Sequence, residues 1–135
     1  MSFGYSAGDF VLCAQLAHRV WRECRDAPED FRVVSTEVAS LQLVLKEVQD
    51  AVHDREMSLA KQQDLKQLVA ACAGVLQELE ELLTKYKSLG THSKRTWDRL
   101  RWSKDHVESI RLRVISNSSL LTSFNVGLLG YVSWN

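Results

Sequence analysis

The stretch from Leu65 to Leu89 constrains the fold of this sequence more than any other part. Its apolar residues follow one another in alternating steps of three and four: Leu65, Leu68, Cys72, Val75, Leu79, Leu82, Tyr86 and Leu89. This spacing places them on one face of an α-helix. A second row widens that face: Val69, Leu76 and Leu83. So wide a stripe is typical of the central helix of a bundle, and Gly90 is expected to end the helix.

A second stretch, residues 31–52, has the same periodicity. Its apolar residues are Phe31, Val34, Val38, Leu41, Leu45, Val48 and Val52. Asp26, followed by Pro28 and Glu29, predicts the start of this helix, with Asp26 as its cap. Residues 53–58 are charged and lack the pattern, so we expect a loop there and a further helix from about Leu59.

The N-terminal segment, residues 1–17, begins a predicted helix that ends near Arg25. Ser6 and Asp9 are spaced as in a capping box. One face carries Phe10, Cys13, Ala17, Val20 and Cys24, and Val11, Leu12, Leu16 and Trp21 broaden it. One interpretation is a buried bundle helix. The other is a helix that leaves the bundle and enters a bilayer, for which several copies would be needed because the apolar run is too short to span one.

The last third of the chain predicts a connection and one long helix. Residues 91–96 are polar, and Trp97, Leu100 and Trp102 form a short helix or a first turn. A long helix is expected from about Lys104 to Leu128, and an interruption at residues 117–119 is left open. The structure of residues 127–135 is left open, and so is a C-terminal boundary of the domain near residue 128.

Together these elements predict an all-α protein, a single helical bundle of four to five helices. At 135 residues the chain is large enough for one core and is expected to be one domain, residues 1–135. One proline and six glycines permit long helices, and no alternating β-branched run predicts a strand.

The sequence predicts no enzyme, no cofactor and no metal site. The four histidines have no metal-ligand spacing, and no Gly-rich phosphate loop or GxSxG motif occurs. The three cysteines lack CxxC spacing and are expected to be free core residues in a reducing, intracellular compartment. The neighbouring carboxylates Glu80 and Glu81 are interpreted as a solvated helix face.

Charge is unevenly distributed along the chain. Residues 1–90 hold 10 Lys and Arg against 14 Asp and Glu, residues 91–113 hold 7 against 3, and residues 114–135 hold none. The basic residues proposed for an anionic lipid or partner surface are Lys94, Arg95, Arg99, Arg101 and Lys104. The alternative is pairing with acids four residues away, with Trp97 and Trp102 in the core. No nucleic-acid partner is expected, because the domain is neutral and lacks a reader motif.

Several motifs resemble one known family. They are Ser2-Phe3-Gly4 with Gly8-Asp9-Phe10, Tyr86 to Gly90, the block from Lys94 to Trp102, Ile110-Arg111, and Ser116-Asn117 with Leu120, Leu121 and Phe124. Over nearly the whole chain they resemble the HeLo-like N-terminal domain of fungal STAND (NLR-like) proteins. The Trp-Asp-Arg-Leu-Arg-Trp run at 97–102 is the most specific part.

The resemblance implies a bundle related to HeLo domains and to the four-helix bundle of the necroptosis executioner pseudokinase. Such domains are cytoplasmic at rest. An upstream NLR or amyloid-signalling partner brings copies together. The resulting homo-oligomer relocates to the plasma membrane, contacts anionic lipids and kills the cell in heterokaryon incompatibility or innate immunity. Without a NACHT module, repeat array or prion-like tail, the chain is expected to be an excised domain or a stand-alone member.

The resemblance also implies that an N-terminal segment, about residues 1–25, is membrane-active. The residues proposed for this role are Phe3, Tyr5, Phe10, Val11, Leu12 and Leu16. Under this hypothesis a charged residue at Leu12 or Leu16 abolishes killing. The alternative hypothesis is a non-enzymatic interaction and oligomerisation module without membrane activity, in which the same substitutions matter only through folding.

Overall fold

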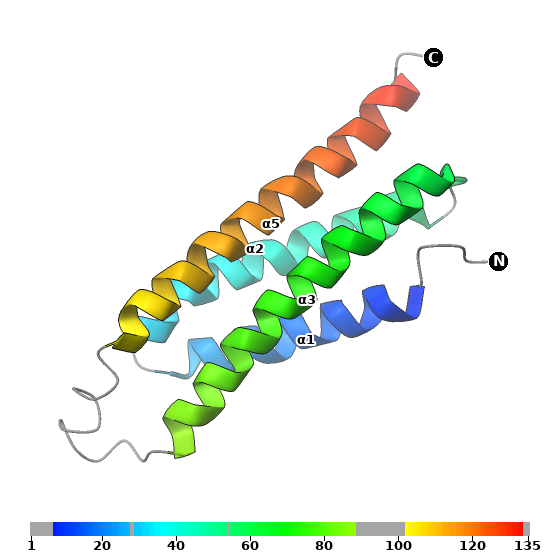
Figure 1. Ribbon diagram of the computed structural model, residues 1–135. Coiled ribbons are helices and arrows are strands. Elements are labelled where there is room, and N and C mark those ends of the chain that lie inside the picture. Colours follow the sequence, from blue (N-terminus) through cyan, green and yellow to red (C-terminus); the bar gives the residue numbers. More distant parts are fainter. Residues whose placement is uncertain (1–6, 28, 54, 89–101, 134–135) are drawn as a thin grey trace.

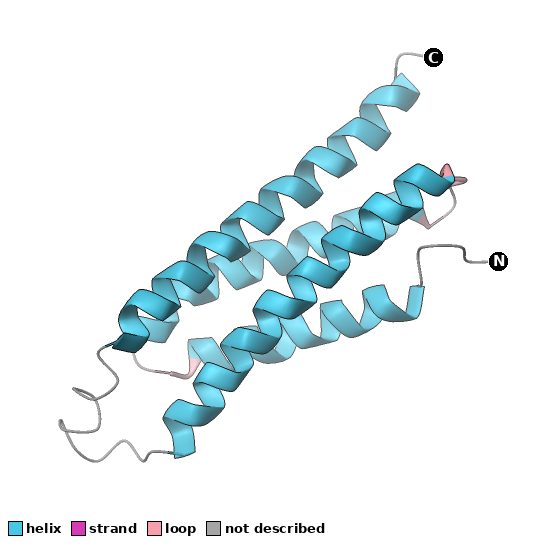
Figure 2. Ribbon diagram, in the orientation of Figure 1, coloured by secondary structure: helices cyan, strands magenta, loops and turns pink. Residues whose placement is uncertain are grey.

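The computed structural model describes residues 7–27, 29–53, 55–88 and 102–133. Within these ranges it contains four helices and no strand, which confirms the predicted all-α bundle (Figures 1 and 2). The helices are α1 (Ala7–Arg25), α2 (Glu29–Val52), α3 (Leu59–Ser88) and α5 (Trp102–Ser133).

Each helix occupies one corner of a four-sided bundle. Successive helices run in opposite directions (Figure 1). Helix α1 packs on α2 and α3, and α5 packs on the same two helices. Consecutive helices α2 and α3 therefore lie at opposite corners. The prediction that residues 65–89 form a central helix is wrong, because the broad stripe of α3 is divided between its two neighbours, α1 and α5.

The predicted apolar stripes form the core. On α3 the stripe residues Leu65, Cys72 and Leu79 are fully buried, and so is Leu76 of the second row. The stripe of α2 is buried from Phe31 to Val52. Burial of one face of each helix removes apolar surface from water, which is the main favourable contribution to folding. Leu89 and Gly90, predicted as the end of α3, lie outside the described residues.

Both short connections are close to the predicted positions. Residues 53–58 separate α2 from α3, and the Lys61 N–H donates to Ser58 Oγ over 3.2 Å, which caps α3. Between α1 and α2, the Asp26 N–H donates to the Arg22 carbonyl over 3.2 Å. Asp26 therefore completes the last turn of α1, and α2 begins only at Glu29.

Helix α5 is longer than predicted, because it begins at Trp102 and extends past Leu128 to Ser133. It is continuous through residues 117–119, where the sequence leaves an interruption open. Val114 and Leu121 are fully buried on either side of residues 117–119, so core packing holds this polar segment in the helix. The predicted positions Trp97 and Leu100 lie outside the described residues, and the side chain of Trp102 is likewise not described.

Candidate functional site

The segment of α1 from Phe10 to Ala17, which follows the charged Asp9, is apolar on nearly all sides. From Phe10 to Ala17 the only polar side chain is that of Gln15. Phe10 is fully buried and Leu16 is 7% exposed, whereas Val11 is 39% and Leu12 64% exposed. The proposed membrane-active residues are therefore divided between the core and the surface. Phe3 and Tyr5 of that set lie outside the described residues.

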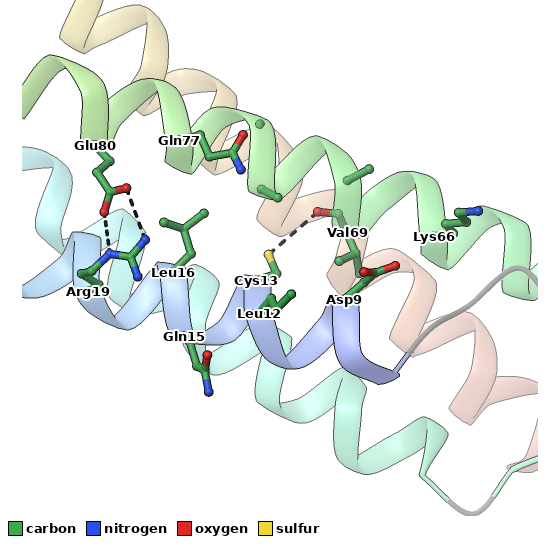
Figure 3. Close-up of a pocket in the computed structure, with 13 residues that line it drawn as sticks. Asp9, Leu12, Cys13, Gln15, Leu16, Arg19, Lys66, Val69, Gln77 and Glu80 are labelled. Carbon is green, nitrogen blue, oxygen red and sulfur yellow. Dashed lines mark hydrogen bonds and ion pairs between the residues drawn. The ribbon is translucent and has the colours of Figure 1, made fainter. Parts of the chain in front are cut away.

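A groove of about 580 Å³ lies between α1 and α3 (Figure 3). Helix α1 contributes Leu12, Cys13 and Leu16, and α3 contributes small residues. These small residues are Ala70, Ala73 and Gly74. A Cβ atom added at Gly74 would meet no other atom within 4 Å, so the space in front of α3 is open. No pattern in the sequence predicts this groove.

One end of the groove is closed by an ion pair between α1 and α3. Arg19 Nε donates to Glu80 Oε2 over 2.6 Å, and a second guanidinium nitrogen donates to Oε1 over 3.2 Å (Figure 3). The hydrogen bond and the charge of Glu80 raise the pKa of Arg19. The Glu80 side chain is 26% exposed and Glu81 is exposed, so the predicted solvated face holds fully for Glu81 and in part for Glu80.

The other end of the groove carries a second pair of opposite charges. Asp9 of α1 and Lys66 of α3 line it there (Figure 3). The acid belongs to α1 at this end, whereas it belongs to α3 at the Arg19–Glu80 end. The order of charges across the groove is therefore reversed from one end to the other.

Two more polar contacts join α1 to its neighbours. Gln42 Nε2 on α2 lies 3.1 Å from His18 Nδ1, and the Cys13 thiol donates to the Val69 carbonyl on α3 over 3.8 Å. Neither involves a fully charged pair. Apolar packing is therefore the main interaction that holds α1 in the bundle.

Helix α5 is joined to α2 and α3 by ion pairs. Arg111 Nε donates to Glu37 of α2 over 3.0 Å. Glu78 of α3 contacts His106 Nε2 at 2.9 Å and Arg113 at 2.8 Å. Hydrogen bonds from His106 and Arg113 lower the pKa of Glu78. Arg111 and Arg113, which belong to the basic part of the sequence, thus connect helices within the bundle.

The other basic residues proposed for a lipid surface have no described side chains. Lys94, Arg95, Arg99 and Arg101 lie outside the described residues. Lys104 belongs to the first turn of α5, and its side chain is also outside the described part. An anionic lipid or partner surface on this stretch stays a prediction.

The three cysteines are free and buried, as predicted. Burial raises the pKa of the Cys13 thiol to about 11 and that of Cys24 to about 12. The pKa of Cys72 rises to about 12, first through burial and then through the charge of Cys13. These thiols are protonated at neutral pH, which makes them poor nucleophiles.

Two other kinds of site were sought in the described ranges. No group of three His, Cys, Asp or Glu side chains there could hold a metal ion. Nor is any helix in those ranges both long enough and apolar enough to cross a membrane.

Comparisons of the chain with protein-family models, with curated proteins and with solved structures give no match. The resemblance to HeLo-like domains therefore stays a prediction from sequence motifs. The class of protein defined by the structure is an all-α, four-cornered helix bundle.

Proposed function

We propose that this chain is a HeLo-like, membrane-targeting and cell-death-inducing effector domain of a fungal NLR-like incompatibility system. It acts by self-association and by exposure of α1 to the bilayer. In this proposal the chain is cytoplasmic at rest and relocates to the plasma membrane when an upstream NLR or amyloid-signalling partner gathers several copies. It performs no catalysis and needs no cofactor.

The observation that carries the proposal is the apolar segment of α1 from Phe10 to Ala17. A helix segment that is apolar on nearly all sides is suited to a buried position or to lipid. The residues from Phe10 to Ala17 are about 12 Å long, much shorter than the hydrocarbon core of a bilayer, which is about 30 Å thick. One copy of α1 can therefore lie in the membrane interface but cannot span the bilayer alone.

Release of α1 from the bundle requires another apolar environment. Moving a buried side chain as large as Phe10 or Leu16 into water costs about 1.5–3 kcal/mol. A bilayer that accepts the same side chains offsets this cost. The Arg19–Glu80 ion pair does not prevent release, because the Arg19 side chain is 57% exposed and surface ion pairs contribute little stability.

Anionic lipids are the proposed membrane partners. The stretch 91–113 holds 7 Lys and Arg against 3 Asp and Glu. Each basic side chain near an anionic surface contributes about 1 kcal/mol to membrane binding. Because Arg111 and Arg113 form ion pairs within the bundle, Lys94, Arg95, Arg99, Arg101 and Lys104 are the residues assigned to this contact.

The test is dye leakage from vesicles with two matched variants. Val11→Glu places a charge on the exposed side of α1, and Val33→Glu does the same on α2, where Val33 is 50% exposed. Phosphatidylserine-containing vesicles should leak with the wild type and with Val33→Glu but not with Val11→Glu. The reason is that a second carboxylate, added two residues from Asp9 in the apolar part of α1, opposes insertion of the helix into lipid. Vesicles of phosphatidylcholine alone should leak less.

Helix content and thermal unfolding measured by circular dichroism provide the control for folding in both variants. Equal leakage with the two glutamate variants would contradict a role for α1. Absence of leakage at concentrations where the protein self-associates would favour the second candidate function, an interaction module without a membrane step. The groove between α1 and α3 is the observation that favours that second candidate.

A further inference from the structure

We propose that two copies of the folded chain associate through the α1–α3 face, which comprises the groove between these helices and its charged ends. In this dimer Leu12 of each copy packs against Ala70, Ala73 and Gly74 of the other. The dimer deepens the self-association step of the proposed function by naming its surface. It forms in solution and needs no membrane.

The shape of the α1–α3 face supports a second copy as its partner. Leu12 stands 64% exposed at the edge of the groove, and opposite it the small residues of α3 leave open space in front of Gly74. A protruding apolar side chain and an apolar depression thus lie on one face. In a two-fold symmetric dimer the same patch meets itself, so Leu12 of each copy enters the depression of the other.

The charges on the α1–α3 face are also self-complementary. A two-fold axis along the groove sets Asp9 of one copy opposite Lys66 of the other, and Arg19 opposite Glu80 (Figure 3). This arrangement places opposite charges together and also sets α1, with Leu12, against α3 of the other copy. Complementary potentials select the partner and its orientation.

The balance of these charges argues against a strongly charged partner. The face carries two acids and two bases, Asp9 and Glu80 against Arg19 and Lys66, so it has no net charge. A nucleic acid or a highly acidic or basic peptide would meet one favourable and one unfavourable charge at each end. A second copy meets only favourable ones.

The first test is sedimentation equilibrium of the 135-residue chain and two serine variants. Leu12→Ser removes the proposed contact, and Leu43→Ser is its match on α2, because Leu43 is 63% exposed. The wild type should form dimers in a concentration-dependent manner. Leu12→Ser should raise the dimer dissociation constant about tenfold or more, as expected for a central interface residue. Leu43→Ser should leave it unchanged.

Two further variants test the depression and the charges separately. Gly74→Gln should weaken the dimer by filling the open space without adding a charge, and the monomer accepts the new side chain because nothing lies within 4 Å of its Cβ. Lys66→Glu should also weaken the dimer, since it places an acid opposite Asp9 of the other copy. Its effect should shrink at high salt, because salt screens exposed charges.

If the wild type stays monomeric up to about 1 mM, the dimer proposal is wrong. Equal dissociation constants for Leu12→Ser and Leu43→Ser would also contradict it. Circular dichroism identifies any variant that fails to fold. The Val11→Glu variant tests the membrane proposal separately from the dimer, because Val11 is not among the residues that line the groove. Leakage that depends on Val11 in a strictly monomeric protein would refute the dimer and retain the membrane function.

Discussion

Leu12 and Leu16 lie about one turn apart on α1, yet they have different surroundings. Leu16 is buried between α1 and α3, whereas Leu12 stands at the edge of the groove. The sequence shows both as members of a broad apolar surface. It cannot show which of them a neighbouring helix covers, because that depends on residues of α3 far away in the chain. The two positions therefore test different properties of the protein.

A charge at Leu16 should destabilise the fold. Leu16→Glu places a carboxylate in the core without a partner and should lower the free energy of unfolding by about 3 kcal/mol or more. Leu12→Glu, on the exposed side, should change it by less than about 0.5 kcal/mol. Urea unfolding followed by circular dichroism measures both. Equal destabilisation by the two substitutions would show that α1 is oriented differently.

The pKa of Glu78 predicts one part of the acid sensitivity of the bundle. Hydrogen bonds from His106 and Arg113 lower it below the ordinary value of 4.5. A carboxyl whose pKa is lower in the folded state stabilises the fold fully above its unfolded pKa. That stabilisation begins to fall as the pH drops below about 4.5, the ordinary pKa. It is lost once the pH has passed through the lower pKa of the folded state.

Glu78→Gln should therefore lower the midpoint of thermal unfolding near pH 7, and the difference from the wild type should shrink as the pH falls below 4.5. Glu81→Gln, at an exposed position on the same helix, serves as the control. A difference between Glu78→Gln and the wild type that is constant from pH 7 to pH 3 would contradict the assigned role of Glu78.

At the scale of the helices, sequence periodicity predicts which faces are buried and says less about where helices end. The stripe of α2 is buried, the described residues of the α3 stripe are buried or partly buried, and α2 ends and α3 begins on either side of residues 53–58, as predicted. Asp26, predicted as the cap of α2, instead continues the last turn of α1 through its N–H, and α2 is described from Glu29. Helix α5 runs through its polar segment because buried residues on both sides, Val114 and Leu121, keep it on the core.

Glycine at position 127 should weaken α5. It lies within the helix, and a Cβ added there meets nothing within 4 Å. Gly127→Ala should raise the free energy of unfolding by about 0.5–1 kcal/mol, because alanine loses less backbone entropy in a helix. Chemical denaturation measures the change. A loss of stability would mean that the helix is not continuous at this position.

At the scale of the whole molecule, the fold class follows from the sequence but the arrangement of the helices does not. Periodicity shows that each helix has a buried face, yet it does not show which helices are neighbours. The diagonal placement of α2 and α3 and the groove between α1 and α3 depend on contacts between distant residues. Arg19 and Glu80 are 61 positions apart, and no local pattern connects them.

The central claim of the proposed function is that α1 leaves the core for lipid. A polarity-sensitive fluorophore on cysteine at position 11 measures this directly, and position 33 on α2 is the control. The native thiols do not compete for the label, because they are buried and their raised pKa values, about 11 to 12, keep them protonated.

With Val11→Cys, phosphatidylserine-containing vesicles should shift the emission to shorter wavelength, and nitroxide-labelled lipids should quench it. With Val33→Cys neither change should occur. Circular dichroism of each labelled protein before lipid is added shows that the bundle is intact. If the protein binds the vesicles while the label at position 11 stays in water, or if both labels respond equally, α1 does not act as the membrane-active element and the account is contradicted.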